Sequence, residues 1–204
     1  MLSGLRVSSH LALVAALVAM GPVPAQACEN AVQLSLDKAK QQLALAEKQL
    51  QLGNARKVLY ALEETSTDDE RVNAELGLAV AVAGLRLGLD NVNRGNNPAK
   101  FIRLAYEANP DHPRMQALYA ESLLRGTFRG TQNTKAAQSQ RTAKALALLT
   151  ELESRDLMPD AHAWAALSRA HREAGSEREA RAANDRCLAA AAKRSVCTWA
   201  LASR

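Results

Sequence analysis

Helical periodicity, broken at intervals by glycine, proline and short polar runs, is the feature that most constrains the fold of this chain. Alanine and leucine recur three and four residues apart, which is the spacing of one face of an α-helix. Strand-like alternation is nearly absent, and aromatic residues make up only 3% of the sequence. We therefore expect an all-α protein. The expected helices cover residues 34–52, 55–64, 70–87, 98–108, 112–125, 141–154, 159–174 and 176–192.

The residues between these helices have the composition of caps and corners. Gly53 and Gly175 fall where the chain would turn back on itself, and Pro98 suits the first turn of a helix, where no amide hydrogen is needed. Residues 126–140 are polar and contain glycine, so we expect them to form the longest irregular segment. The eight helices would then form four antiparallel pairs.

The last helical pair resembles the tetratricopeptide repeat family. The match begins at Ala161, and Asn184 departs from it, because the family has a large aromatic residue there. The residues that stand at the family's characteristic positions are Trp164, Leu167, Ser168, His171, Gly175, Ala180 and Cys187.

Earlier parts of the chain resemble the same family more weakly. Residues 99–110 look like the second helix of a repeat that ends on the family's terminal proline. A repeat that begins near Ala39 has matching residues at Leu45, Ala46, Gly53 and Val58. The resemblance implies about four helical hairpins, stacked as a short right-handed α-solenoid. Such hairpins share a continuous core, since a single one cannot bury both of its apolar faces.

The first 27 residues have the features of a secretory signal. Arg6 supplies positive charge, residues 11–20 are an unbroken apolar run, and small residues stand at Ala25 and Ala27. The apolar run is about half of the roughly 20 residues that span a bilayer. We expect cleavage after Ala27 and export to the periplasm or out of the cell, which leaves residues 28–204 as one helical repeat domain.

Three cysteines fit an oxidising compartment. Cys187 and Cys197 are near enough in sequence to form a disulfide that pins the C-terminal tail to the last helix, with a contribution of about 2–3 kcal/mol. Cys28 follows the expected cleavage point, and a lipid on its sulfur would leave one possible disulfide pair. Ala25 and Gln26 both depart from the lipoprotein pattern, so ordinary cleavage is favoured. We expect membrane association only if Cys28 is lipidated.

The residues that carry catalysis in other proteins do not form a recognisable set in this sequence. His162 and His171 are nine residues apart, which does not place them on one helix face as metal ligands, and no Glu or Cys completes a zinc set. The sequence has neither a phosphate-binding glycine loop nor the G-x-S-x-G motif of a nucleophilic serine. We therefore expect a protein that is not an enzyme and that uses no metal or cofactor.

The distribution of charge indicates the kind of partner. The net charge is +5, and residues 125–204 carry 14 basic and 8 acidic side chains. An exported protein seldom meets nucleic acid, so we expect a partner of acidic character: a protein or peptide, with anionic lipid headgroups and acidic glycans as alternatives.

The resemblance implies a concave groove lined by the first helix of each pair. Its expected lining residues are Lys40, Leu43, Glu47, Arg114, Ala117, Glu121, Leu124, His162, Ala165, Arg169, Arg172 and Glu173. Among these, we expect the partner-binding residues to be Arg114, Glu121, His162, Arg169, Arg172 and Glu173. Arg169 and Arg172 would form a basic end of the groove.

Two other functions remain open at this point. An alanine-rich interior would enclose a channel for a small apolar molecule, as in helical-repeat proteins associated with solute transport. A chain tethered through a lipid on Cys28 would be a structural lipoprotein. The leading hypothesis is an exported adaptor or scaffold that binds a protein in its groove.

Overall fold

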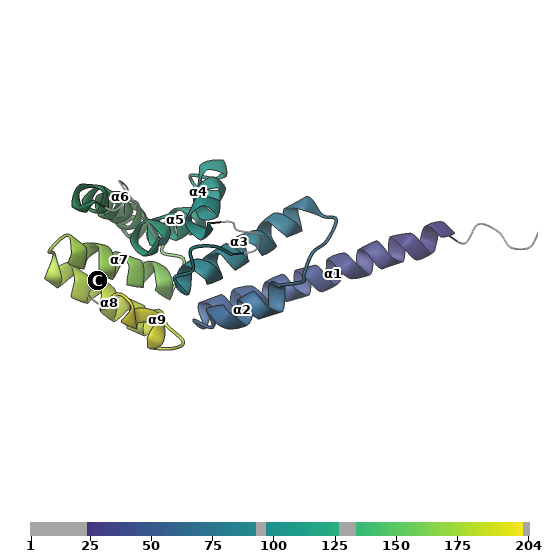
Figure 1. Cartoon of the computed structure of the whole chain (residues 1–204). Coiled ribbons are helices and arrows are strands. Elements are labelled where there is room, and N and C mark those ends of the chain that lie inside the picture. The colour runs from purple at the N-terminus through teal and green to yellow at the C-terminus, as the bar shows by residue number, and fades with distance from the viewer. Residues whose placement is uncertain (1–23, 93–96, 127–133, 202–204) are drawn as a thin grey trace, which may run out of the picture.

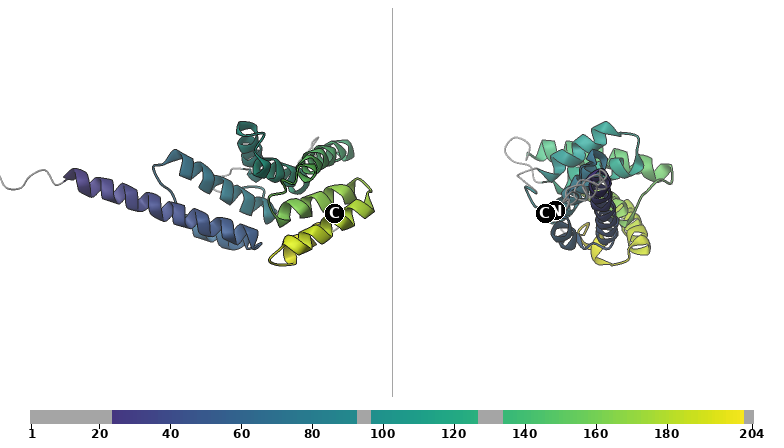
Figure 2. Two further views of the ribbon diagram at one scale, coloured as in Figure 1. Left: turned by 180° about the vertical axis from the view of Figure 1, so that it is seen from behind. Right: turned by 90° about the vertical axis from the view of Figure 1, so that its right-hand side faces the viewer.

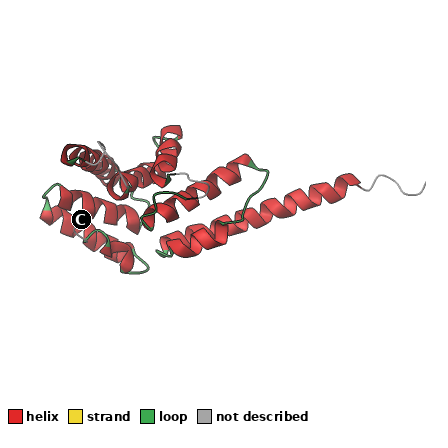
Figure 3. Ribbon diagram, viewed as in Figure 1, coloured by secondary structure: helices red, strands yellow, loops and turns green. Residues whose placement is uncertain are grey.

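The structure, a computed structural model, describes residues 24–92, 97–126 and 134–201, with side chains from residue 32 onward. The described part of the chain is all-α, with nine helices (Figures 1 and 3). These helices are α1 (Pro24–Gln51), α2 (Ala55–Leu62), α3 (Glu70–Arg86), α4 (Pro98–Ala108), α5 (Pro113–Arg125), α6 (Lys135–Ser154), α7 (Ala161–Glu173), α8 (Glu177–Ala190) and α9 (Ser195–Thr198).

Each helix packs against the next one in the chain in an antiparallel manner. A second set of contacts links alternate helices, because α1 packs on α3, α3 on α5, and α5 on α7. The first half of α1 extends beyond the other helices (Figure 2). Among the residues that the structure describes, no helix combines the length and the apolar character needed to cross a bilayer.

The helix bounds follow the sequence expectation closely in the middle of the chain. Helix α4 has the expected bounds, and the side chain of Asn97 caps it by accepting a hydrogen bond from the amide of Lys100 at 3.0 Å. Helix α3 begins at the expected Glu70, after Asp69 accepts from the amide of Val72 at 2.9 Å. Local capping residues therefore determine where these helices begin.

Three expectations about helix bounds are wrong. Helix α1 begins at Pro24 rather than at residue 34, and the short helix α9 was not expected. Helix α6 begins at Lys135, so residues 135–140 are helical rather than irregular. The side chain of Thr134 caps this helix by accepting from the amide of Ala137 at 3.2 Å, and good helix formers follow it. Residues 127–133 lie outside the described part of the chain.

The expected signal segment, residues 1–27, overlaps the start of α1. Residues 1–23 lie outside the described residues, and the expected cleavage point after Ala27 falls in the first turns of α1. Cys28 stands in the same turns of the backbone.

Small and medium-sized aliphatic residues fill the interior. Buried side chains form one cluster from α1 through α5, a second from α5 through α8, and a third around α7, α8 and α9. Leu45, expected to match a buried position of the family, is 54% exposed. The buried face of α1 runs instead through Ala39, Leu43, Ala46 and Leu50.

The corner between α7 and α8 is made by Gly175, as the sequence predicted. Gly175 has a φ of +82°, a conformation that glycine adopts without steric penalty. Its amide donates to the carbonyl of Arg172 at 3.0 Å. Next to this corner the two helices approach closely, and the hydroxyl of Ser168 donates to the carbonyl of Ala180 at 2.7 Å.

The disulfide between Cys187 and Cys197 is present, as the sequence predicted. Both cysteines are buried, and they pack with Val196 and Ala200 against α7. The bond therefore joins α8 to α9 and holds the C-terminal segment on the body of the protein.

Candidate functional site

Helices α1, α3, α5 and α7 meet around a concave pocket of about 150 Å³. Each contributes residues to its wall, although the four helices are far apart in sequence. The lining residues are Glu47, Leu50, Gln51, Val82, Arg86, Arg114, Ala117, Leu118, Glu121, Pro159, Asp160 and Ala163. Four residues expected to line a groove, Glu47, Arg114, Ala117 and Glu121, thus share one pocket.

An ion pair between α1 and α5 forms the rim of this pocket. Nη1 of Arg114 lies 2.7 Å from Oε1 of Glu47, and the two side chains are 43% and 39% exposed. Gln51, one helical turn beyond Glu47, is also exposed. These side chains are accessible to a partner, and the pair presents both signs of charge at the surface.

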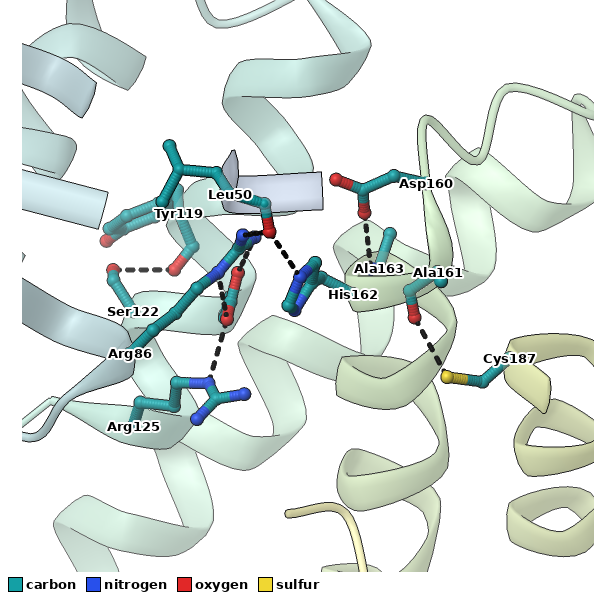
Figure 4. Close-up of polar contacts among 11 residues, drawn as sticks. Leu50, Arg86, Tyr119, Ser122, Arg125, Asp160, Ala161, His162, Ala163 and Cys187 are labelled. Atoms are coloured by element: carbon teal, nitrogen blue, oxygen red, sulfur yellow. Dashed lines mark hydrogen bonds and ion pairs between the residues drawn. The ribbon is translucent and has the colours of Figure 1, made fainter. Parts of the chain in front are cut away.

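The base of the pocket is a buried charge network around Glu121 of α5. Nε and Nη2 of Arg86 donate to the two carboxylate oxygens of Glu121 at 3.1 and 2.9 Å. Nε of Arg125 forms an ion pair with the same carboxylate at 2.8 Å. Arg86 also donates from Nη1 to the carbonyl of Leu50 at 3.1 Å. The network therefore joins α3 and α5 to the C-terminal end of α1 (Figure 4).

Burial and the opposite charges nearby have opposing effects on the pKa values of Glu121 and Arg125. Burial alone would raise the pKa of Glu121, but the positive charges of Arg86 and Arg125 outweigh it and lower the pKa to about 2. Burial lowers the pKa of Arg125 to about 10, against the opposing effect of Glu121. The network therefore places one carboxylate between two guanidinium groups.

His162 of α7 contacts the same carbonyl of Leu50 that accepts from Arg86. Its Nε2 lies 3.0 Å from the carbonyl oxygen of Leu50, so the neutral ring carries its proton on Nε2 and donates it there. Nδ1 is buried without a hydrogen-bond partner among the described residues. Burial and the nearby charge of Arg86 lower the pKa of His162. The imidazole is therefore neutral at pH 7 and ties α7 to α1.

The network is covered on one side by the C-terminal segment. The guanidinium of Arg125 lies 3.5 Å from the centre of the Trp199 ring, in a cation–π arrangement. Arg172 donates from Nη1 to the carbonyl of Leu201 at 3.3 Å. The Cys187–Cys197 disulfide holds this segment in place, so the C-terminal segment and the buried charges pack together.

Other residues expected to line the groove lie elsewhere. Nε of Arg169 contacts Glu173 at 2.7 Å, and Glu173 accepts from the hydroxyl of Thr142 at 2.7 Å. The side chains of Arg169 and Glu173 are only 7% and 14% exposed. The sequence placed Arg169 and Arg172 at the open basic end of a groove, but the structure turns them toward α6 and the C-terminal segment. Leu43, Leu124, Ala165 and His162 are buried, and Lys40 is exposed on α1 outside the pocket.

A second concavity, which the sequence did not predict, lies between α4 and α6 and has a volume of about 590 Å³. Tyr119 forms part of its floor and stands two residues from both Ala117 and Glu121 of the concave pocket. Two residues correspond to about 200° around a helix, so Tyr119 points away from Ala117 and Glu121, and the cleft lies on a different face of α5. Its lining residues are Asn97, Ala99, Lys100, Arg103, Tyr119, Ser122, Leu123, Ala137, Gln140, Arg141 and Lys144. The signal in the sequence was a pair of cations three residues apart on each flanking helix.

The three carboxylates that line the concave pocket all have partners on the protein. Glu47 and Glu121 are each paired with arginine, and Asp160 accepts a hydrogen bond from the amide of Ala163 at 2.9 Å. Within the described residues, no group of three or more His, Cys, Asp or Glu side chains is arranged to hold a metal ion. Compared with known proteins, the chain matches no family model, no curated protein and no solved structure. Its function must therefore be inferred from the geometry of these sites.

Proposed function

We propose that this chain is an exported, non-enzymatic adaptor that binds a partner protein on the face formed by α1, α3, α5 and α7. In this proposal the helical pairs are tetratricopeptide-like repeats stacked as a short right-handed solenoid. The observation that carries the proposal is the convergence of these four helices on one pocket with an exposed, charge-paired rim at Glu47 and Arg114. Helical-repeat proteins use concave surfaces of this kind for binding.

The buried network beneath the pocket supports this role. Arg86, Glu121 and His162 fix the positions of the four helices through hydrogen bonds that cross between them. A surface held in this way is preorganised, so a partner does not have to order it on binding. The paired rim favours a polar segment that carries both signs of charge.

Crosslinking from inside the pocket tests the binding proposal. A photo-crosslinking residue at Gln51, which is exposed and lines the pocket, should capture a partner in cell-envelope extract. The same residue at Gln41, exposed on α1 outside the pocket, is the matched control. Arg114→Glu should abolish the Gln51 adduct, because it replaces the rim ion pair with two like charges. Equal capture from Gln41, or an adduct that survives Arg114→Glu, would show that the pocket is not the binding surface.

The proposed export has a separate test. The disulfide between Cys187 and Cys197 is consistent with an oxidising compartment. The intact mass of the protein recovered from expressing cells should correspond to a chain that begins at Cys28. A mass increased by a lipid would favour the lipoprotein alternative, and a mass that retains residues 1–27 would refute cleavage.

A further inference from the structure

We infer that the cleft between α4 and α6 is a second binding site, which takes an acidic polypeptide segment. The cleft is separate from the concave pocket, because the two share no lining residue and lie on different faces of α5. The inference therefore goes beyond the proposed function and does not require it. Four features support it: the positive charge of the cleft walls, two exposed lysines that form no ion pair with the described residues, the aromatic and aliphatic side chains of the floor, and the open shape.

The walls of the cleft are positively charged on both sides. Lys100 and Arg103 stand three residues apart on α4, and Arg141 and Lys144 stand three apart on α6. This spacing places each pair on one face of its helix. No carboxylate is found among the described residues that line the cleft. A bound segment would therefore meet cations from two opposite directions.

The two lysines of the cleft differ in their pairing from several arginines elsewhere in the protein. Arg86, Arg114 and Arg186 each lie within 3 Å of a carboxylate oxygen. In the cleft, Lys100 and Lys144 are exposed and form no ion pair with the described residues. Their charges are therefore available to an external anion.

The other two cations differ in exposure. Arg103 lies 3.8 Å from Glu107, and both side chains are more than half exposed, so that pair contributes little. Arg141 is partly buried in the α6 wall and adds positive charge there.

Aromatic and aliphatic side chains form much of the floor of the cleft. Tyr119 stacks on Tyr106 with ring centres 4.4 Å apart, and its hydroxyl contacts Nζ of Lys144 at 3.3 Å. Leu123 and Ala137 complete the floor. A segment that fits would present carboxylates to the walls and small apolar side chains to the base.

The arrangement favours a polypeptide over a small anion. Exposed cations bind single carboxylates weakly, because water and salt screen the attraction. A segment with several carboxylates contacts both walls at once, so the individual contributions add within one binding event. The cleft is open at the surface, as an extended or helical segment requires.

Fluorescence anisotropy on the full chain tests the inference. The probe is a labelled peptide of about twelve residues in which glutamate alternates with alanine, and the matched peptide has glutamine in place of glutamate. The glutamate peptide should bind, and raising sodium chloride from about 50 to about 300 mM should weaken it. Lys100→Glu with Lys144→Glu should reduce its affinity about tenfold or more, because two attractions become repulsions.

The matched control has the same net charge as the Lys100 and Lys144 double variant but changes a different surface. Lys48→Glu with Lys57→Glu reverses two exposed lysines on α1 and α2 and should leave the affinity within about twofold. Arg114→Glu should also leave it unchanged, which separates this site from the concave pocket. Thermal unfolding by circular dichroism confirms that each variant is folded.

Three results would overturn the inference. An equal loss in the Lys48 and Lys57 variant would show that net charge alone attracts the peptide. Equal binding of the glutamine peptide would show that carboxylates are not recognised. Competition by free glutamate at the same carboxylate concentration as the peptide would reassign the cleft to small anions.

Discussion

Replacing Glu121 with glutamine should destabilise the protein strongly, because Glu121 is the counter-ion of two buried arginines. Glutamine keeps the size of the side chain but removes its charge. Arg86 and Arg125, with side chains 7% and 14% exposed, would then be left facing each other without a carboxylate between them. Removing one partner of a buried ion pair typically costs about 3–5 kcal/mol.

The pKa of Glu121 gives an independent magnitude. A carboxyl whose pKa falls from 4.5 to about 2 on folding contributes about 3 kcal/mol to the free energy of unfolding, fully present above pH 4.5. That contribution is lost as pH falls from about 4.5 to about 2, since the carboxylate then takes up a proton. We therefore expect Glu121→Gln to lower the free energy of unfolding by about 3 kcal/mol at pH 7. Acidification below pH 4.5 should destabilise this variant less than the unsubstituted protein, because the variant has no carboxylate at this position to protonate.

Urea unfolding followed by circular dichroism at pH 7 and at pH 3 measures both effects. At pH 7 the midpoint temperature should also fall by about 6–12 °C for a chain of this size. Glu75→Gln is the control, because Glu75 pairs with the exposed Arg71 and should contribute less than about 1 kcal/mol. A loss at pH 7 no larger than that of the control, or an acid dependence equal to that of the unsubstituted protein, would refute the role assigned to Glu121.

Three further predictions concern other parts of the assembly. Reducing the Cys187–Cys197 disulfide should lower the free energy of unfolding by about 2–3 kcal/mol, and an unchanged midpoint with reductant would contradict this. The free energy of unfolding should decrease as pH falls below about 6.5, because the pKa of His162 is lowered on folding. His162→Gln should reduce this loss, and an unaltered pH dependence in that variant would exclude His162 as its source. Gly175→Ala should cost about 1–2 kcal/mol in urea unfolding, because alanine is strained at a φ of +82° and nothing within 4 Å obstructs its methyl group; a neutral effect would show that the corner relaxes.

Much of the fold follows from local signals in the sequence. The bounds of α4 were correct because asparagine and proline stand at both of its ends. The corner between α7 and α8 was predicted because Gly175 marks it. The start of α6 was missed because Thr134, a capping residue, stands in a polar run that was assigned as a loop. Helix α9 has only four residues, too few for periodicity to reveal.

The candidate site could be predicted only in part, because periodicity gives the face of a helix but not what covers it. Arg114 lies at the rim of the pocket, since its helix face is open there. His162 lies under the carbonyl of Leu50, and Arg172 contacts the carbonyl of Leu201. Both contacts join residues distant in sequence, so no local sequence pattern predicts that these side chains are covered.

The position of Trp199 over Arg125 has a consequence for the order in which contacts can form during folding. Trp199 and Arg125 are far apart in sequence, so closing the chain between them costs more entropy than pairing Arg125 with Glu121, one helical turn away. The helices that carry Arg86, Glu121 and Arg125 can therefore pair before the C-terminal segment docks. Water can still reach the guanidinium of Arg125, so the charges first meet in a hydrated environment. The desolvation of this ion pair is therefore a late event, completed when the tail arrives and the disulfide closes.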